Sequence, residues 1–408
     1  MRWPMVPLGA IAEIVGGSTP SREVAEYWDG SIPWVTPTDL PMPGKGIAAL
    51  KDTDTAGRIT EQGLASSAAN LLPLGTVLFS SRATIGKLAI TEVPAATNQG
   101  FANFIPGPAV YNRYLAWALQ FHTPNIERLA GSTTFKEVTK TALKAFRIPL
   151  PSLSEQRRIV EILDQANRLL KLRREADAKC SQVLPALFIM MFGDPTANPR
   201  KLRKKPLGEL IRVKSGEFLP TREMAIGGEF PVYGGNGISG YHDKYMFEEA
   251  KIVLGRVGAY CGAVHYTTPK AWITDNALYV SEKFENLDDL YLVTALRLAN
   301  LNQYAGRAGQ PLISGSRIYP IEILIPHERE QQSFARSTVI LQGLDAQRFQ
   351  LSQKLDRIWA SLMQRAFSGL LTAHWRETRI KELVAEIEQQ MNLLNLPPTK
   401  LARLATRA

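Results

Sequence analysis

The sequence is poor in cysteine and has no long apolar run. Its 408 residues include two cysteines, too few for a disulfide framework and typical of a protein from a reducing compartment. The longest apolar stretch, residues 183–192, is too short to cross a bilayer and predicts the buried end of a helix. Glu13 interrupts the only apolar run near the N-terminus, which argues against a signal peptide. We therefore expect a cytoplasmic protein that does not enter a membrane.

Motifs of catalysis are missing as well. There is no G-x-x-x-x-G-K-[ST] loop for ATP, no Gly-rich turn for S-adenosylmethionine and no Asn-Pro-Pro-aromatic loop for a target amine. The five histidines and two cysteines are not at metal-ligand spacings, and the carboxylates do not cluster as in a metal nuclease. We expect that this chain binds no cofactor or metal and catalyses nothing alone.

Positive charge is in excess. Lysine and arginine number 48 against 38 acidic residues, a net charge of +10. Such an excess favours a polyanionic partner, and nucleic acid above all; the alternative is a basic protein whose charge has no specific partner.

The chain also repeats itself. From Glu155-Gln156 to Phe192, the first copy matches the second at an offset of 175 residues without a gap, whereas after Gly369 we find no counterpart in the first copy. The matched segments are Pro7-Leu8-Gly9 with Pro206-Leu207-Gly208, "SSRATIGK" (80–87) with "GRVGAYCG" (255–262), "TNQGF" (97–101) with "TDNAL" (274–278), and "IPLPSLSEQRRI" (148–159) with "ILIPHEREQQSF" (323–334).

Each copy joins a turn-rich region to a long helical stretch. Glycine, proline and short β-branched runs mark the turn-rich regions, whereas residues 153–192 contain no glycine and have Pro185 as their only proline. We predict an α+β fold in which two similar globular α/β domains are joined by two long antiparallel coiled-coil helices with pseudo-twofold symmetry. The predicted parts are a first domain (1–152), a first helix (153–193), a basic linker (194–205), a second domain (206–327), a second helix (328–377), and a helical extension with a basic tail (378–408).

A heptad pattern favours pairing of the two helices. Apolar residues alternate at spacings of four and three, with Arg173 and Arg348 at the equivalent middle layer. The alternative is that each helix packs on its own domain. At about 1.5 Å per residue each helix would be roughly 55 Å long, so the two domains fit major-groove segments about 34 Å apart on B-DNA. The residues expected to form the seam and set the spacing are Ile162, Leu169, Arg173, Val183, Leu187, Leu341, Leu344, Arg348, Leu351, Leu355, Ile358 and Leu362.

Side chains suited to DNA lie at matching places in the two copies. Arg82 matches Arg256 at a strand end, and arginine is the commonest reader of guanine. Amides read adenine and aspartate accepts from cytosine, although capping of loop backbone is the alternative for the amides. The candidate DNA-binding residues are Arg82, Thr84, Lys87, Asn98, Gln99, Thr133, Thr134, Lys136, Arg256, Asp275, Asn276, Gln310, Ser314 and Arg317.

Several motifs, in order along the chain, resemble a known family. "AEYWDGSIPWVTPTDL" (25–40), "SSRATIGK" and "IPLPSLSEQRRI" are similar to the target recognition domain and following conserved region of type I restriction–modification specificity subunits. "GEFPVYGGNGISGY" (228–241), "GRVGAYCG" and "ITDNAL" (273–278) resemble a second such domain, and "AFSGLLTAHWRE" (366–377) resembles the C-terminal conserved region. The resemblance extends to about residue 377.

The resemblance implies a subunit that reads a split site in double-stranded DNA, one half per domain. It further implies that the helices dock two modification (methyltransferase) subunits, and that restriction/translocase subunits join the complex. S-adenosylmethionine, ATP and Mg are then expected on the partner subunits. Two alternatives stay open: a two-headed coiled-coil adaptor that does not read DNA sequence, and the specificity subunit of a methyltransferase-only or other restriction system.

Overall fold

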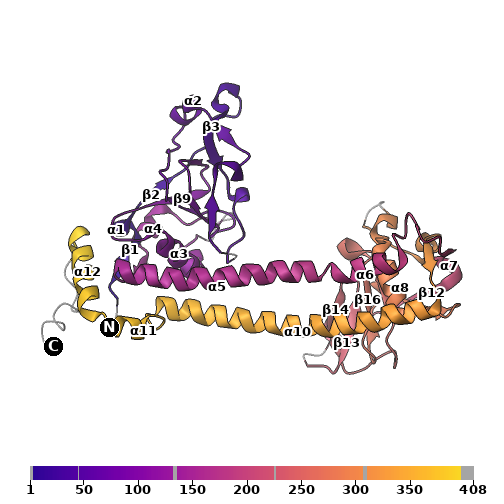
Figure 1. The fold of residues 1–408 in the computed structure, drawn as a ribbon. Coiled ribbons are helices and arrows are strands. Elements are labelled where there is room, and N and C mark those ends of the chain that lie inside the picture. The colour runs from indigo at the N-terminus through magenta and orange to yellow at the C-terminus, as the bar shows by residue number, and fades with distance from the viewer. Residues whose placement is uncertain (1–2, 45, 132–135, 225–226, 307–309, 397–408) are drawn as a thin grey trace. The chain divides into compact units, whose positions relative to one another are not determined.

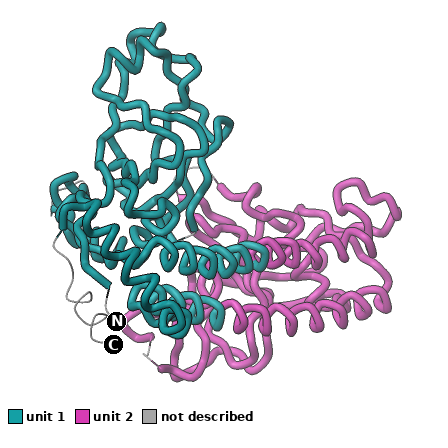
Figure 2. The backbone as a smooth tube through the Cα atoms, turned by 60° about the vertical axis from the view of Figure 1, so that its left-hand side comes forward, with its two compact units in different colours: residues 1–173, 353–408 teal, residues 174–352 magenta. Residues whose placement is uncertain are grey.

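The computed structural model describes residues 3–44, 46–131, 136–224, 227–306 and 310–396. It contains two compact units, coloured separately in Figure 2: unit 1 is residues 1–173 and 353–408, and unit 2 is residues 174–352. Each unit combines one globular region with parts of both long helices, a division that differs from the predicted domain boundaries. Within the described ranges, no helix is long and apolar enough to cross a membrane.

Three sheets build the globular region of unit 1 (Figure 1). The largest has the strand order β2–β9–β6–β7–β4, a second has the order β5–β3–β8, and β1 pairs with β10. The strands are β1 (Met5–Pro7), β2 (Ala12–Gly16), β3 (Trp28–Val35), β4 (Ala48–Leu50), β5 (Arg58–Ile59), β6 (Val77–Ser80), β7 (Leu88–Thr91), β8 (Ala96–Thr97), β9 (Phe101–Pro106) and β10 (Arg147–Pro149). The helices are α1 (Leu8–Ile11), α2 (Glu61–Ala65), α3 (Asn112–Glu127) and α4 (Lys140–Ala145).

Burial on both faces explains the continuous apolar run of β6. Val77 and Phe79 belong to the main core of unit 1, together with Trp117 of α3, whereas Leu78 packs with Phe101 in a second core on the other face. Successive side chains of a strand point to opposite faces, so a strand covered on both sides needs apolar residues throughout.

Unit 2 repeats this architecture. Its sheets have the orders β12–β18–β15–β16, β14–β13–β17 and β11–β19, which match those of unit 1 strand for strand except that, within the described part of unit 2, β4 has no counterpart. The prediction of two similar α/β domains is thereby confirmed. The elements are β11 (Arg203–Pro206), α7 (Leu207–Leu210), β12 (Ile211–Ser215), β13 (Phe230–Gly234), β14 (Gly237–His242), β15 (Ile252–Gly255), β16 (Val264–Tyr266), β17 (Trp272–Ile273), β18 (Ala277–Lys283), α8 (Asp289–Leu298), α9 (Gly315–Ile318) and β19 (Glu322–Ile325).

Repeated side chains make the same bonds in both units. Tyr114 of α3 donates to the carbonyl of Pro149 (2.7 Å), and Tyr291 of α8 donates to that of Leu324 (2.8 Å). The repeated Gln156 and Gln331 each accept, at Oε1, a backbone N–H at the start of α3 or α8, at 2.7 and 3.1 Å. The sequence motif thus recurs because it fixes the same helix start twice.

The first long helix is interrupted and the second is not. α5 (Leu153–Cys180) ends at a two-residue turn before α6 (Val183–Phe192), which differs from the single helix predicted there. Pro185 has no N–H to donate to the carbonyl of Ser181, and a proline ring clashes with that carbonyl. The equivalent position is Ala360, and α10 (Glu328–Phe367) is continuous.

In each unit the adjoining parts of these helices run in opposite directions. In unit 1, Glu155 near the start of α5 binds Arg376, which follows the end of α10. In unit 2, Asp177 near the end of α5 accepts from Arg348 Nε at 2.9 Å, and Phe188 of α6 packs on Phe334 near the start of α10. Pairing of the helices along their whole length as a coiled coil stays a prediction.

The buried side of each helix is offset from the predicted seam at alternate positions. The predicted residues that are half-buried are Ile162, Arg173, Leu187, Leu341, Arg348, Leu355 and Leu362. The predicted residues that are exposed are Leu169, Val183, Leu344, Leu351 and Ile358. At three of these positions the adjacent apolar residue, Leu170, Leu184 or Trp359, is half-buried instead. Adjacent apolar pairs fit two phases of the heptad, so the pattern did not select between them.

The turn after α10 has a counterpart after α6, and the expectation that nothing after Gly369 is repeated is wrong. Gly193 and Gly369 both take positive φ (83° and 81°). Arg200 then binds Glu330 (2.9 Å), as Arg376 binds Glu155 (2.8 Å). Between the glycine and the arginine of each turn, the two sequences share only a Thr-Ala pair, so the sequence gives little sign of the repeat here.

Helix α12 (Ile380–Leu393), which follows α11 (Ala373–Glu377), packs on unit 1 (Figure 1). Its apolar face is buried through Leu383, Val384, Ile387 and Met391. Glu386 accepts from Ser154 N and Oγ at 3.0 and 2.6 Å, and so binds the first turn of α5. The basic tail, residues 397–408, lies outside the described residues.

Candidate nucleic-acid interface

In unit 1 the loop between β6 and β7 carries Arg82, and two neighbouring loops are bonded to it. Ser81 N–H donates to Gly100 O (2.8 Å) and Ala83 N–H to Lys136 O (3.1 Å). The chain thus brings Arg82 together with the Asn98-Gln99 turn and with Lys136. Lys136 and Gln99 are exposed, whereas Asn98 Oδ1 accepts from Gly100 N–H (2.9 Å), the loop-capping role considered as its alternative. Thr133 and Thr134 lie outside the described residues.

Other candidates in unit 1 have local partners. Arg82 Nε lies 2.8 Å from Glu137 Oε1, and both side chains are nearly half exposed. Lys87 Nζ donates to the carbonyl of Pro37 (2.6 Å), and the carbonyl of Thr84 accepts from Ser80 Oγ (2.6 Å). The guanidinium of Arg82 is therefore partly neutralised before any ligand arrives.

Unit 2 builds the same site around Arg256, directly after β15. Arg256 N–H donates to Asn276 O (3.0 Å), and its Nη1 donates to Ser215 Oγ (3.0 Å) and Asp275 O (3.4 Å). Gly258 N–H donates to Pro311 O (3.0 Å), which places the exposed Gln310 beside this loop. Within the described part of unit 2, no carboxylate lies at ion-pair distance from Arg256.

The remaining candidates of unit 2 lie near the start of α9. The hydroxyls of Ser314 and Ser316 are 2.9 Å apart, and Arg317 is exposed on the helix. Arg317 also lies beside Gly306, where an added Cβ would come within 2.9 Å of its Nη2. These residues follow the loop that contains Gln310, and the preceding Ile313 donates its N–H to Arg256 O (2.9 Å), so they lie beside the Arg256 loop.

Two exposed aromatic residues near Arg256 were missed in the sequence. Phe218 is 71 % exposed in the loop after β12, three residues beyond the Ser215 that binds Arg256, and Tyr260 is 55 % exposed in the loop of Arg256 itself. In unit 1 the corresponding loop after β2 holds Thr19, whose hydroxyl donates to Gln99 (2.6 Å). Exposed aromatic rings beside arginine can stack on bases.

A pair of glycines is the signal that could have located these loops. A Cβ on Gly17 would lie 2.2 Å from Thr97 O, and one on Gly216 would lie 2.2 Å from Ile273 O. Only glycine permits these close approaches. Both glycines stand at the same distance after the repeated Pro-Leu-Gly.

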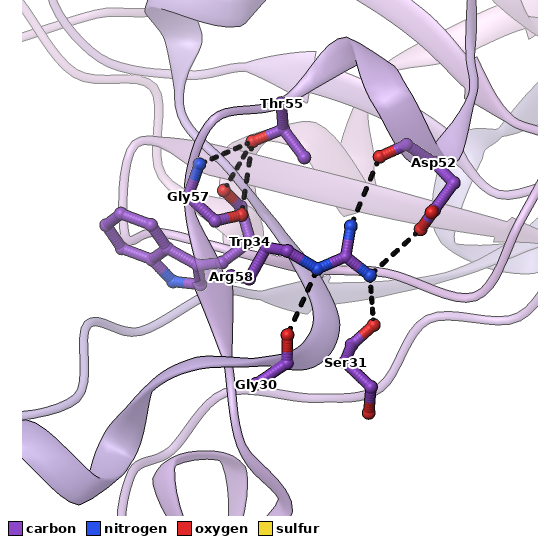
Figure 3. A network of polar contacts seen from close by, with 7 residues as sticks. All are labelled: Gly30, Ser31, Trp34, Asp52, Thr55, Gly57 and Arg58. Atoms are coloured by element: carbon purple, nitrogen blue, oxygen red, sulfur yellow. Dashed lines mark hydrogen bonds and ion pairs between the residues drawn. The ribbon is translucent and has the colours of Figure 1, made fainter.

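A network of polar contacts fixes strand β3 of unit 1 (Figure 3). Arg58 donates to Gly30 O (3.1 Å) and Asp52 Oδ1 (3.1 Å) and so fixes strand β3. Trp34 at the end of β3 donates Nε1 to Ser18 O (3.0 Å), next to Gly17. Arg58, half-buried at the start of β5, therefore has a structural role.

The side chains of both loop clusters are of the kinds that take part in recognition. Arginine, amide and hydroxyl groups on loops can bond to base edges and phosphates. Among the described residues there is no group of three or more His, Cys, Asp or Glu side chains that could hold a metal ion.

Comparison with known proteins agrees with this architecture. The pattern of the type I restriction modification DNA specificity domain matches residues 2–179 and again 199–356. The chain is 33 % identical over 239 residues to the type I restriction enzyme MjaIX specificity subunit of Methanocaldococcus jannaschii, covering 54 % of each chain. It is 26 % identical over 350 residues to the EcoprrI specificity subunit of Escherichia coli, covering 80 % of this chain and 84 % of that one. The chain therefore spans about half the length of the first relative and most of the second.

Solved structures share the fold. The S subunit of the type I restriction–modification system from M. genitalium superposes with a TM-score of 0.56 at 17 % identity, covering 90 % of this chain and 96 % of that one. A chain described in work on assembly and conformational transition of the type I R-M system gives 0.58 at 16 % identity, covering 91 % and 98 %. Together, the duplicated fold and the two matches to one domain show that this chain belongs to the type I restriction–modification DNA specificity family.

Proposed function

We propose that the chain is the non-catalytic specificity subunit of a type I restriction–modification complex, and that each unit reads one half of a bipartite site in double-stranded DNA. The observation that carries the proposal is duplication of the complete set of recognition loops. Arg82 and Arg256 follow equivalent strands, and each lies among amide and hydroxyl side chains. A protein that bound one uniform ligand would not need two sites with different side chains.

The charge of the chain supports DNA as the ligand. A net charge of +10 gives long-range attraction to phosphates. Loop arginines and amides then supply sequence discrimination, about 1–3 kcal/mol for each well-placed bidentate pair.

The partners in this proposal are two modification subunits and, in a complete complex, restriction/translocase subunits. S-adenosylmethionine, ATP and Mg bind to those subunits, and the complex works in the cytoplasm. The exposed apolar residues of the long helices, Leu169 and Leu344 among them, are available for docking. The same surface suits the specificity subunit of a methyltransferase-only system.

Methylation-aware sequencing tests the proposal directly. Cells that express this chain with its modification subunit are expected to carry methylated adenines in one bipartite motif, and cells lacking the chain to carry none. A salt-dependent mobility shift of the purified chain on DNA with that motif gives the second readout. Unchanged methylation together with no DNA binding would instead favour the two-headed adaptor.

A further inference from the structure

Each unit has a groove between its helices, and the two grooves occupy equivalent positions of the repeat. In unit 1 the groove lies between α5 and α10 and has a volume of about 170 Å³. In unit 2 it lies between α10 and the turn that joins α5 to α6, and has a volume of about 340 Å³. Six lining positions correspond at the offset of 175 residues: Ala166 with Leu341, Leu169 with Leu344, Leu170 with Asp345, Leu355 with Cys180, Ile358 with Val183, and Trp359 with Leu184.

The floors of the grooves differ because two tryptophans are replaced. In unit 1, Trp117 of α3 packs on Trp359 with ring centroids 5.5 Å apart. Tyr114 and Tyr291 make the same bond, so Trp117 corresponds to Thr294 three residues further along. Trp359 corresponds to Leu184. The smaller pair leaves more space in the unit 2 groove, about 340 Å³ against about 170 Å³.

The walls differ in charge. All residues lining the unit 1 groove are apolar, whereas the unit 2 groove includes Arg297, Asp345 and Arg348. Arg348 is bonded to Asp177 and Asp345. Arg297 donates Nε to Val264 O (3.0 Å) and, among the described residues, has no carboxylate at ion-pair distance.

Arg297 is the feature that distinguishes the two grooves. By the tyrosine alignment its counterpart in unit 1 is Gln120, a buried amide. Arg297 remains accessible from the groove, while desolvation by the surrounding protein lowers the pKa of its guanidinium. A carboxylate brought by a ligand would favour the charged form of Arg297 and so compensate for this desolvation.

We infer that the grooves are two unequal docking sites for one partner surface, an apolar helical ridge of the modification subunit that carries a carboxylate. The inference rests on the proposed function. In unit 1 the ridge contacts only apolar walls, so docking there resists salt. In unit 2 the same ridge places its carboxylate against Arg297, so docking there depends on charge and is weakened by salt.

The repeat supports the modification subunit as the partner that occupies both grooves. One kind of partner bound twice needs two equivalent grooves, which the offset of 175 residues provides. Leu169 and Ile358 flank the unit 1 groove and are 67 % and 62 % exposed, which leaves apolar surface open beside it. The charged wall of the unit 2 groove calls for a partner with an acidic group, because an apolar ridge alone would bury Arg297 without compensation.

The test counts modification subunits bound to the full-length chain by native mass spectrometry and sedimentation. At about 50 mM salt two are expected, and at about 500 mM salt one, with at least about tenfold weaker binding of the second. Arg297→Gln, which copies Gln120, should lose the second subunit even at low salt. The matched control Arg222→Gln removes an arginine whose side chain is 85 % exposed outside the groove, and should keep both.

The native cysteines provide a second measurement. Cys180 is exposed and lines the unit 2 groove, whereas Cys261 is buried. A bulky maleimide on Cys180 should therefore block one subunit and leave the other, and Cys180→Ser should be insensitive to the reagent. Leu169→Glu should instead remove the salt-resistant subunit.

Equal binding of two subunits at both salt concentrations, unchanged by Arg297→Gln and by the maleimide, would overturn this inference while leaving the proposed function intact. A wild-type chain that binds no modification subunit at any salt concentration would overturn both.

Discussion

Unit 1 and unit 2 share the residues that hold their fold together (the frame) and differ in the side chains that their loops expose (the presented residues). The frame residues recur with the same bonds: Tyr114 and Tyr291, Gln156 and Gln331, Gly17 and Gly216. The presented residues do not: Arg82 is paired with Glu137, whereas Arg256 is bonded to a hydroxyl and a carbonyl. Repetition therefore marks structure in this chain, and divergence within the repeat marks recognition.

The largest expected difference concerns two equivalent ion pairs. Glu155 is fully buried and accepts from Trp3, Thr372 and Arg376, whereas Glu330 is partly exposed and binds Arg200. Glu155→Ala leaves a buried charge unpaired and should cost unit 1 about 3–5 kcal/mol. Glu330→Ala should cost unit 2 about 0–1 kcal/mol.

Urea unfolding can resolve these two variants. Six of the seven tryptophans lie in unit 1 and only Trp272 lies in unit 2, so fluorescence follows unit 1 and hydrogen exchange follows unit 2. Similar losses for both variants would show that burial does not separate the two pairs.

Helix α12 provides the next comparison, because in the part of the chain that the structure describes it has no counterpart in unit 2. Ile387 belongs to the unit 1 core, and Ile387→Ala should destabilise that unit by about 2–5 kcal/mol through the cavity it leaves. Ile380→Ala, at an exposed position of the same helix, should stay within about 0.5 kcal/mol. Hydrogen exchange of unit 2 should be unaffected by either change, and its acceleration would contradict separate folding of the units.

The next comparison is between Arg82 of unit 1 and Arg256 of unit 2, at the proposed DNA interface. Arg256→Ala should weaken binding by about 1–3 kcal/mol and relax one base of one half-site. Arg82→Ala should cost less, because Glu137 already pairs with Arg82, and Glu137→Gln should strengthen binding. Binding isotherms on cognate and single-mismatch duplexes check this. A uniform loss across sequences with a shallower salt slope would assign the arginine to phosphate.

The smallest expected effect is a dependence of stability on pH, which His122 contributes to unit 1; in unit 2, burial likewise lowers the pKa of His265. Both ring nitrogens of His122 are buried without a hydrogen-bond partner among the described residues, and burial lowers the pKa of this histidine. The folded state therefore binds the proton less readily than the unfolded state, whose pKa is about 6.5. Stability of unit 1 should be complete above that pH and decrease as pH falls below it, by up to about 1.4 kcal/mol per pH unit.

Replacing His122 with leucine tests the assignment. The variant should lose this part of the acid sensitivity of unit 1, measured by urea unfolding at several pH values. The same slope in wild type and variant would place the titrating group elsewhere.

The sequence predicted the two domains and the two long helices correctly, but not the break in the first helix or which side of each helix is buried. Long ordered matches such as "SEQRRI" (154–159) with "REQQSF" (329–334) located both domains and both long helices, because the same backbone bonds require the same residues twice. It did not predict the break before Pro185, since one proline in a helical stretch can sit in a first turn or end a helix. The seam was ambiguous where two apolar residues are adjacent, as at Leu169-Leu170.

At the candidate interface, matching the two repeats identified the equivalent loops correctly. It did not predict which partners the side chains of these loops bind. Arg82 and Arg256 align in the repeat. The carboxylate that pairs with Arg82, that of Glu137, lies on a loop far along the chain, and the placement of that loop cannot be derived from the alignment. Phe218 and Tyr260 carried no signal, because exposed aromatic residues in turn-rich segments look like core residues. Exposure is a property of the fold, which composition does not reveal.

Independent reading by the two units is the central claim, and a chain with two copies of one reader tests it most directly. Residues 206–327 would be replaced by the equivalent segment of the first unit, with the long helices retained. Methylation-aware sequencing should then report a motif in which the half-sequence read by unit 1 occurs twice and the other half is absent. Retention of the original second half, or a change in both halves, would contradict the account.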